Sequence, residues 1–229
     1  VFTWEDHLLK RDGTPITSGQ RRFWDFNDPF VIDYLESKII NFIKKFNFGY
    51  LKIDYNETIG IGCDHSDSLG EGLRVQMEAV QAFFCKIQKE CPQLVIENCS
   101  SGGHRLEPSM LGLTSMSSFS DAHEELEIPI IAANMHRVML PKQSQIWAVL
   151  RKDDTEKRLR YSITSTFLGR MCLSGDIYDL QEAQWSIVDE GIHFYKRISH
   201  LIRDGVSYRF GPKVQSYRHP VGWQALVRT

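Results

Sequence analysis

Short apolar runs alternate along this chain with longer stretches of helical periodicity. An apolar helical face over residues 28–47 is followed at once by the run YLKID at 50–54, and a second helical pattern over 71–90 precedes a run that starts at 94. A strand, a helix and a strand within about thirty residues is the size of a parallel crossover unit. Because this unit repeats, the sequence predicts an α/β fold with parallel strands.

Six parallel strands are predicted, near residues 23, 50, 94, 115, 146 and 171. Helices are predicted over 28–47, with Asp28 as N-cap and Gly49 as the stop signal, and over 71–90, 107–111, 128–140, 156–168 and 181–202. Since an eight-stranded barrel needs about 250 residues, we expect a (β/α)8 TIM barrel without its first strands. A doubly wound sheet fits the alternation nearly as well.

The pattern changes after residue 204 to short alternating runs, which predict antiparallel strands. We therefore expect a barrel domain over 1–204, incomplete at its N-terminus, and the start of a C-terminal β-sandwich domain over 205–229.

Composition excludes several classes of partner. The 27 basic and 29 acidic residues are spread along the chain, so no basic footprint for nucleic acid is present. No apolar run approaches the roughly 20 residues that span a bilayer, so no membrane partner is expected. The five cysteines show no CxxC spacing, which predicts free thiols in a reducing compartment and a cytoplasmic protein.

Two acidic residues follow apolar runs, Asp54 after 50–53 and Asp121 after 115–119. In a barrel of parallel strands, polar groups at the C-terminal strand ends face one pocket. Two carboxylates in such a pocket, roughly 5 to 5.5 Å apart, can cleave a glycosidic bond with retention. Asp54 and Asp121 are therefore the predicted catalytic pair, although Asp121 alone also fits a helix N-cap.

Polar residues near Asp54 fit the same chemistry. Lys52 lies two positions earlier and points to the same side of the strand, where its cation would keep Asp54 ionised. Asn56 shares that parity and could donate to a substrate hydroxyl, while Trp24 could stack on a sugar face. The alternative is an ordinary ion pair between Lys52 and Asp54 at a strand end.

The small residues CSSGG at 99–103 would let backbone amides approach a sugar closely. A GxGxxG dinucleotide motif is missing, and no cofactor is expected. Residues 64–67 and 121–124 contain metal-ligand types, so a metal-dependent hydrolase is an alternative of another class, although we expect no metal. A non-catalytic sugar-binding remnant is a further alternative.

The strand-end motifs KIDYN at 52–56, ENCSSGGHR at 97–105 and SDAHE at 120–124 resemble the KWDxN, ESCSSGGGR and SDxxD motifs of the α-galactosidases of glycoside hydrolase family 36. The resemblance covers nearly the whole chain. It implies a retaining hydrolase that removes terminal α-galactosyl residues from oligosaccharides by double displacement. It also implies that Asp54 is the nucleophile and Asp121 the acid/base. The positions that match the galactose pocket are Lys52, Asn56, Cys99 and Gly102.

The chain departs from these motifs at several positions. Members of the family usually carry an arginine before the third strand of their barrel. Gly19 stands at that position here, with Arg21 or Arg22 as substitutes. These differences leave open a related α-glycosidase, such as an α-N-acetylgalactosaminidase or a raffinose-type transglycosylase. An α-galactoside oligosaccharide is the expected partner, and a homo-oligomer of the full-length protein is left open. The motif departures are Ile53 for tryptophan, Asn98 for serine, His104 for glycine and Glu124 for aspartate.

Overall fold

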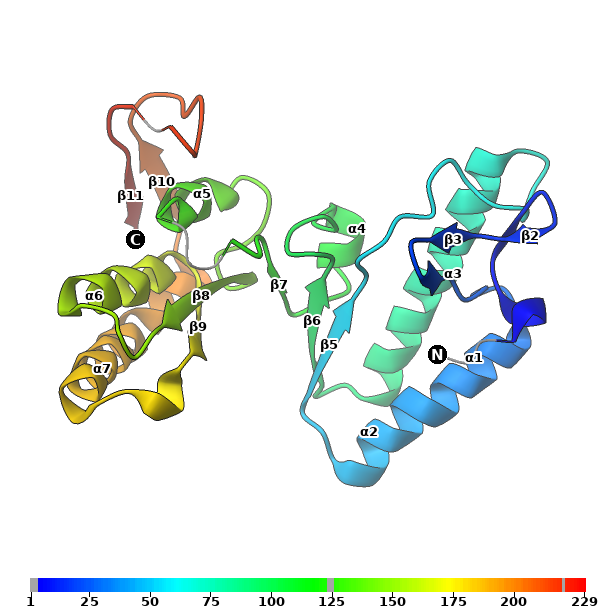
Figure 1. Cartoon of the computed structure of the whole chain (residues 1–229), viewed down its shortest axis with the longest axis horizontal. Helices are drawn as coiled ribbons and strands as arrows, with labels where there is room; N and C mark the ends of the chain where they lie inside the picture. The colour runs from blue at the N-terminus through cyan, green and yellow to red at the C-terminus, as the bar shows by residue number, and fades with distance from the viewer. Residues whose placement is uncertain (1–3, 123–125, 220) are drawn as a thin grey trace. The chain divides into compact units, whose positions relative to one another are not determined.

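The computed structural model describes residues 4–122, 126–219 and 221–229 (Figure 1). The chain forms two compact units. Unit 1 comprises residues 1–100 and 112–114, and unit 2 comprises residues 101–111 and 115–229. None of the helices in the described ranges is both long and apolar enough to cross a membrane.

Unit 1 begins with a short 3-10 helix, η1 (Glu5–His7), and two small antiparallel hairpins. Asp12 and Gly13, both at positive φ, form the two-residue turn of the first hairpin. The predicted strand near residue 23 is wrong, because among the described residues Trp24 forms only an isolated bridge to Leu8. The aromatic side chains at 23–26 are placed by packing rather than by a sheet. The hairpin strands are β1 (Lys10–Arg11), β2 (Thr14–Pro15), β3 (Thr17–Ser18) and β4 (Arg21–Arg22).

A single helical run follows and confirms the predicted helix over 28–47. Asp28 is its N-cap and accepts a hydrogen bond from the backbone N–H of Phe30 at 2.9 Å. The run ends at Asn47, whose φ of 54° is left-handed, and not at Gly49 as expected. Asparagine tolerates this conformation, so it closes the helix two residues earlier. The run consists of α1 (Pro29–Leu35), the π-helical turn η2 (Glu36–Ile40) and α2 (Asn41–Phe46).

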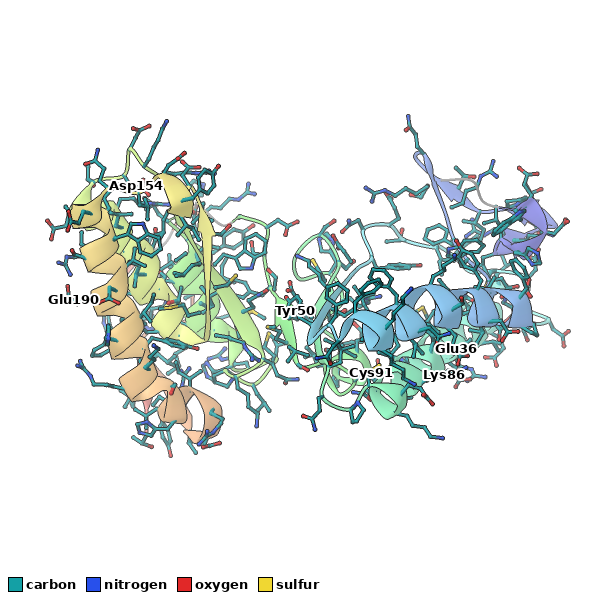
Figure 2. The ribbon with its side chains drawn as sticks, turned by 90° about the horizontal axis from the view of Figure 1, so that it is seen from below. Glu36, Tyr50, Lys86, Cys91, Asp154 and Glu190 are labelled. Carbon is teal, nitrogen blue, oxygen red and sulfur yellow. The ribbon has the colours of Figure 1, made fainter. Side chains whose placement is uncertain are left out.

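The crossover unit predicted from the alternation is present as β5 (Tyr50–Asp54), α3 (Leu69–Glu90) and β6 (Val95–Cys99). The two strands pair in parallel, with Asp54 opposite Cys99. Ion pairs Glu36–Lys86 and Lys44–Glu90 join α3 to the preceding helical run, and the first of them is labelled in Figure 2. The crossover therefore brings the ends of β5 and β6 to one edge of unit 1.

Unit 2 continues the alternation, with β7 parallel to β8 and β8 parallel to β9. Five of the six expected parallel strands are thus present in the described part of the chain. The predicted helix over 128–140 is too long, because α5 ends at Met135 and Pro141 disfavours a helical conformation at Leu140. The elements up to β9 are α4 (Pro108–Leu111), β7 (Met116–Ser118), α5 (Ile128–Met135), β8 (Ser144–Leu150), α6 (Glu156–Ser165), η3 (Thr166–Leu168) and β9 (Arg170–Gly175).

The core of unit 2 lies between its central strand and two helices. Ala148 and Leu150 of β8 pack against Leu159 of α6 and Val188 of α7 (Glu182–Asp204), which follows η4 (Ile177–Asp179). Figure 1 shows α6 and α7 running side by side. After α7, β10 (Ser207–Phe210) and β11 (Ala225–Arg228) form the antiparallel pair predicted beyond residue 204. The domain boundary expected at 204/205 stays a prediction.

Candidate active site

In unit 1, the edge formed by β5 and β6 carries three of the predicted site residues. Asp54 is exposed at the end of β5, and its partner Cys99 ends β6 with 3% of its surface exposed. The Asn56 side chain donates a hydrogen bond from Nδ2 to Asp54 Oδ2 at 3.0 Å. The predicted nucleophile is therefore an accessible carboxylate held by a neighbouring amide, as attack on a substrate requires.

Lys52 lies one layer below Asp54 on the same face of β5. Its Nζ is 3.2 Å from Oε1 of Glu97, the residue opposite it on β6. The spacing of Lys52 and Asp54 predicted that this cation would serve Asp54, and Glu97 was not among the predicted site residues. A signal was available, because Glu97 interrupts an apolar run two positions before Cys99 and therefore shares its face.

In unit 2, the glycine pair at 102–103 packs against the strand end that carries Asp121. Gly102 has a φ of +78°, and a Cβ atom there would lie 2.8 Å from the backbone nitrogen of Asp121. A Cβ at Gly103 would lie 2.4 Å from the carbonyl oxygen of Phe119. The structure thus brings the predicted residues Gly102 and Asp121 together, through backbone contact that only glycine permits.

Asp121 itself is exposed after β7. The helix N-cap alternative does not apply to α5, the next described helix, because Glu127 occupies that position. The Ser120 hydroxyl accepts a hydrogen bond from the backbone N–H of Ala122 at 3.0 Å, which shapes the turn around Asp121. His123 and Glu124 lie outside the described residues.

Replacing Gly102 by alanine is expected to destabilise the protein by about 2 to 5 kcal/mol. Left-handed backbone costs a residue with a Cβ about 1 to 2 kcal/mol, and the clash with Asp121 adds about 1 to 3 kcal/mol. Gly13→Ala is the matched control, because Gly13 has a φ of +72° and open space around its Cβ position. Denaturant unfolding of both variants measures the difference, and equal losses would contradict the packing role of Gly102.

Trp24 lies in an aromatic cluster at the N-terminal side of unit 1. Its ring centroid is 6.4 Å from that of Trp4 and 5.8 Å from that of Tyr34. Its carbonyl oxygen accepts a hydrogen bond from the Gln76 side chain at 2.9 Å. These contacts explain the position of Trp24 by packing within the protein, and stacking of a sugar on it stays a prediction.

The two arginines proposed as substitutes differ in placement. Arg21 Nη1 lies 3.3 Å from Oε1 of Glu57, on the loop that leaves β5 just after Asp54. Arg22 instead pairs with Glu5 at 2.8 Å. Of the two, Arg21 is therefore the one held near the end of β5.

The residues of the metal-site alternative have structural contacts. Both carboxylate oxygens of Asp64 accept backbone hydrogen bonds, from Asp12 at 2.9 Å and Gly13 at 2.8 Å. These two amides lower the pKa of the Asp64 carboxyl, with the Gly13 contact contributing most. His65 Nε2 lies 2.9 Å from Oδ1 of Asp25. Within the described ranges no group of three histidine, cysteine or acidic residues is placed to hold a metal ion.

Known proteins resemble this chain in sequence over much of its length. Alpha-galactosidase 2 of Pediococcus pentosaceus is 29% identical over 124 residues, which are 51% of this chain and 17% of that protein. Alpha-galactosidase AgaA of Geobacillus stearothermophilus is 26% identical over 219 residues, which are 89% of this chain and 29% of that protein. The chain therefore spans less than a third of the length of these relatives.

Solved structures share its fold. A crystal structure of glycoside hydrolase family 36 α-galactosidase AgaA, a variant in complex with 1-deoxygalactonojirimycin, matches with a TM-score of 0.78 and 23% identity, covering 89% of this chain and 29% of that chain. Other AgaA variant structures contain raffinose or stachyose. The α-galactosidase from Lactobacillus brevis matches with a TM-score of 0.75 and 21% identity, over 90% of this chain and 29% of its own. These likenesses confirm the predicted fold class, a stretch of β/α barrel followed by antiparallel strands.

The family profile named Melibiase matches residues 3–205. This range contains both predicted catalytic aspartates, the turn at 99–103 and every parallel strand of the described structure. Because the match covers most of the chain, the chain belongs to the melibiase family.

Proposed function

We propose that the protein containing this chain is a retaining glycoside hydrolase that removes terminal α-galactosyl residues from oligosaccharides. The observation that carries the proposal is the edge of β5 and β6, where Asn56 holds the accessible Asp54 carboxylate beside Cys99 in a chain of the melibiase family. Its relatives named α-galactosidase, and the AgaA complexes with raffinose and stachyose, support the same substrate class.

The proposed reaction begins with attack of the Asp54 carboxylate on the anomeric carbon. Asp121 donates its proton to the departing glycosidic oxygen, so a covalent β-galactosyl ester of Asp54 forms. In the second step Asp121 takes a proton from water, which attacks the same carbon and releases α-galactose. The Lys52 cation favours the ionised form of Asp54 before the first step.

The proposed sugar contacts are made by the predicted binding residues. Lys52 and Asn56 donate hydrogen bonds to sugar hydroxyls, and Cys99 shapes the pocket wall at the end of β6. Gly102 lets the backbone approach the sugar, and Trp24 offers an aromatic face.

The direct test uses the full-length protein and an aryl α-galactoside, with proton NMR of the sugar released. Retention predicts that α-galactose appears first and then mutarotates. β-Galactose as the first product would contradict double displacement, and turnover of only the N-acetylated analogue would favour an α-N-acetylgalactosaminidase. Loss of activity with a chelator would favour a metal-dependent hydrolase, and sugar binding without turnover would favour a non-catalytic remnant.

A further inference from the structure

One face of the β5–β6 pair carries a column of polar side chains below the strand ends. Tyr50, Lys52 and Asp54 alternate along β5 and share this face. Tyr50, labelled in Figure 2, begins β5, and Asp54 ends it. Lys52 lies directly opposite Glu97, and Asp54 directly opposite Cys99. The Lys52–Glu97 layer is therefore adjacent to the layer that contains the proposed nucleophile.

Glu97 is the most deeply buried charged residue of this column. Its side chain is 3% exposed, whereas that of Lys52 is 35% exposed. Oε1 of Glu97 lies 3.2 Å from the Lys52 ammonium, and Oε2 accepts a hydrogen bond from the Tyr50 hydroxyl. Oε1 therefore takes part in an ion pair and Oε2 in a hydrogen bond, with residues two positions apart on the neighbouring strand.

Burying a charged carboxylate without a partner costs much free energy. The side chains that contact Glu97 are therefore favoured in the positions where they keep these contacts. Lysine is a flexible side chain that would otherwise extend toward solvent. The 3.2 Å ion-pair contact to a buried carboxylate, which Tyr50 holds by a hydrogen bond, restricts where the ammonium can lie. Lys52 is thereby kept on the face that carries Asp54.

We propose that Glu97 is a positioning residue that fixes the Lys52 ammonium next to the proposed active site, with Tyr50 holding Glu97 in turn. The inference rests on the proposed function, since the ion pair is inferred to serve sugar binding and to favour the ionised form of Asp54. Glu97 itself acts through Lys52 and forms no bond to the substrate.

A double-mutant cycle on the full-length protein tests this role. Glu97→Gln keeps the side-chain shape and removes the charge, and we expect kcat/KM for an aryl α-galactoside to fall about 10- to 100-fold, the value of a hydrogen bond to a charged group. Lys52→Met should lose at least as much. If Glu97 acts through Lys52, the double variant loses no more than Lys52→Met alone.

Two further variants provide controls. Tyr50→Phe removes the hydrogen bond to Glu97 and leaves the ion pair with Lys52 in place, so its loss should be smaller than that of Glu97→Gln. Glu90→Gln breaks the exposed Lys44–Glu90 pair in the same unit and should leave kcat/KM unchanged. The positioning role would be overturned if the fold-losses in kcat/KM of Glu97→Gln and Lys52→Met multiplied in the double variant. Full activity of Glu97→Gln would overturn it as well.

Thermal unfolding of the same variants tests the ion pair without using activity. Lys52→Met strands the Glu97 carboxylate, so its Tm should lie below that of the double variant, in which glutamine removes the stranded charge. A double variant that is less stable than Lys52→Met would contradict the pair. If the wild-type protein lacks α-galactosidase activity, the proposed function and the positioning role fail together, while the Tm cycle still decides whether the pair exists.

Discussion

Replacing Asp54 by alanine in the full-length protein is expected to lower kcat for an aryl α-galactoside by about ten-thousand-fold or more. The variant has no carboxylate to form the glycosyl ester, and loss of a catalytic nucleophile has effects of this size. The fold should persist, because Asp54 is exposed and its contact with Asn56 lies at the surface. Initial rates together with Tm measurements check the expectation.

The product formed with azide tests whether the group missing from this variant is the nucleophile. A small anion that enters the space left by the Asp54 carboxylate should attack the anomeric carbon from the nucleophile's side and yield β-galactosyl azide. Asp67→Ala is the control, since Asp67 is an exposed acidic residue on the loop after β5. Retained activity of Asp54→Ala would exclude Asp54 as the nucleophile, and a large loss from Asp67→Ala would favour the metal-dependent alternative.

The periodicity of the chain was enough to predict the elements that carry Asp54 and Cys99. Helical spacing over 71–90 between two apolar runs defines a parallel crossover, and its geometry alone places the two strand ends at one edge. The strand near residue 23 was predicted wrongly, because an aromatic run has high strand propensity whether or not a neighbouring strand exists to pair with it.

Other parts of the candidate site depend on contacts between residues distant in sequence. The register that sets Lys52 opposite Glu97 depends on how β5 and β6 align, which a single sequence does not encode locally. The packing of Gly102 against Asp121 likewise joins a turn to a strand end 19 residues away. Sequence motifs could identify these residues individually, but only the fold shows which of them touch.

Replacing Asp121 by alanine is expected to give a loss that depends on the leaving group. A poor leaving group such as the sucrose of raffinose needs a proton as the bond breaks, so kcat/KM should fall by about 100- to 10,000-fold. A dinitrophenyl galactoside leaves without protonation, so its kcat/KM should fall far less. Steady-state kinetics with both substrates separate this pattern from that of Asp54→Ala, which should lose activity on both.

The second half of the Asp121 reaction gives an independent readout. With an activated substrate the Asp54 ester still forms, but water attacks it slowly without a base, so the ester should accumulate and produce a burst of phenolate. Azide needs no base, so it should restore turnover and yield α-galactosyl azide, the opposite anomer from the one expected with Asp54→Ala. If both variants gave the same anomer, or if Asp121→Ala lost equal activity on both substrates, Asp121 could not be the acid/base. Opposite anomers from the two variants would show that the two carboxylates act from opposite faces of the sugar, as double displacement requires.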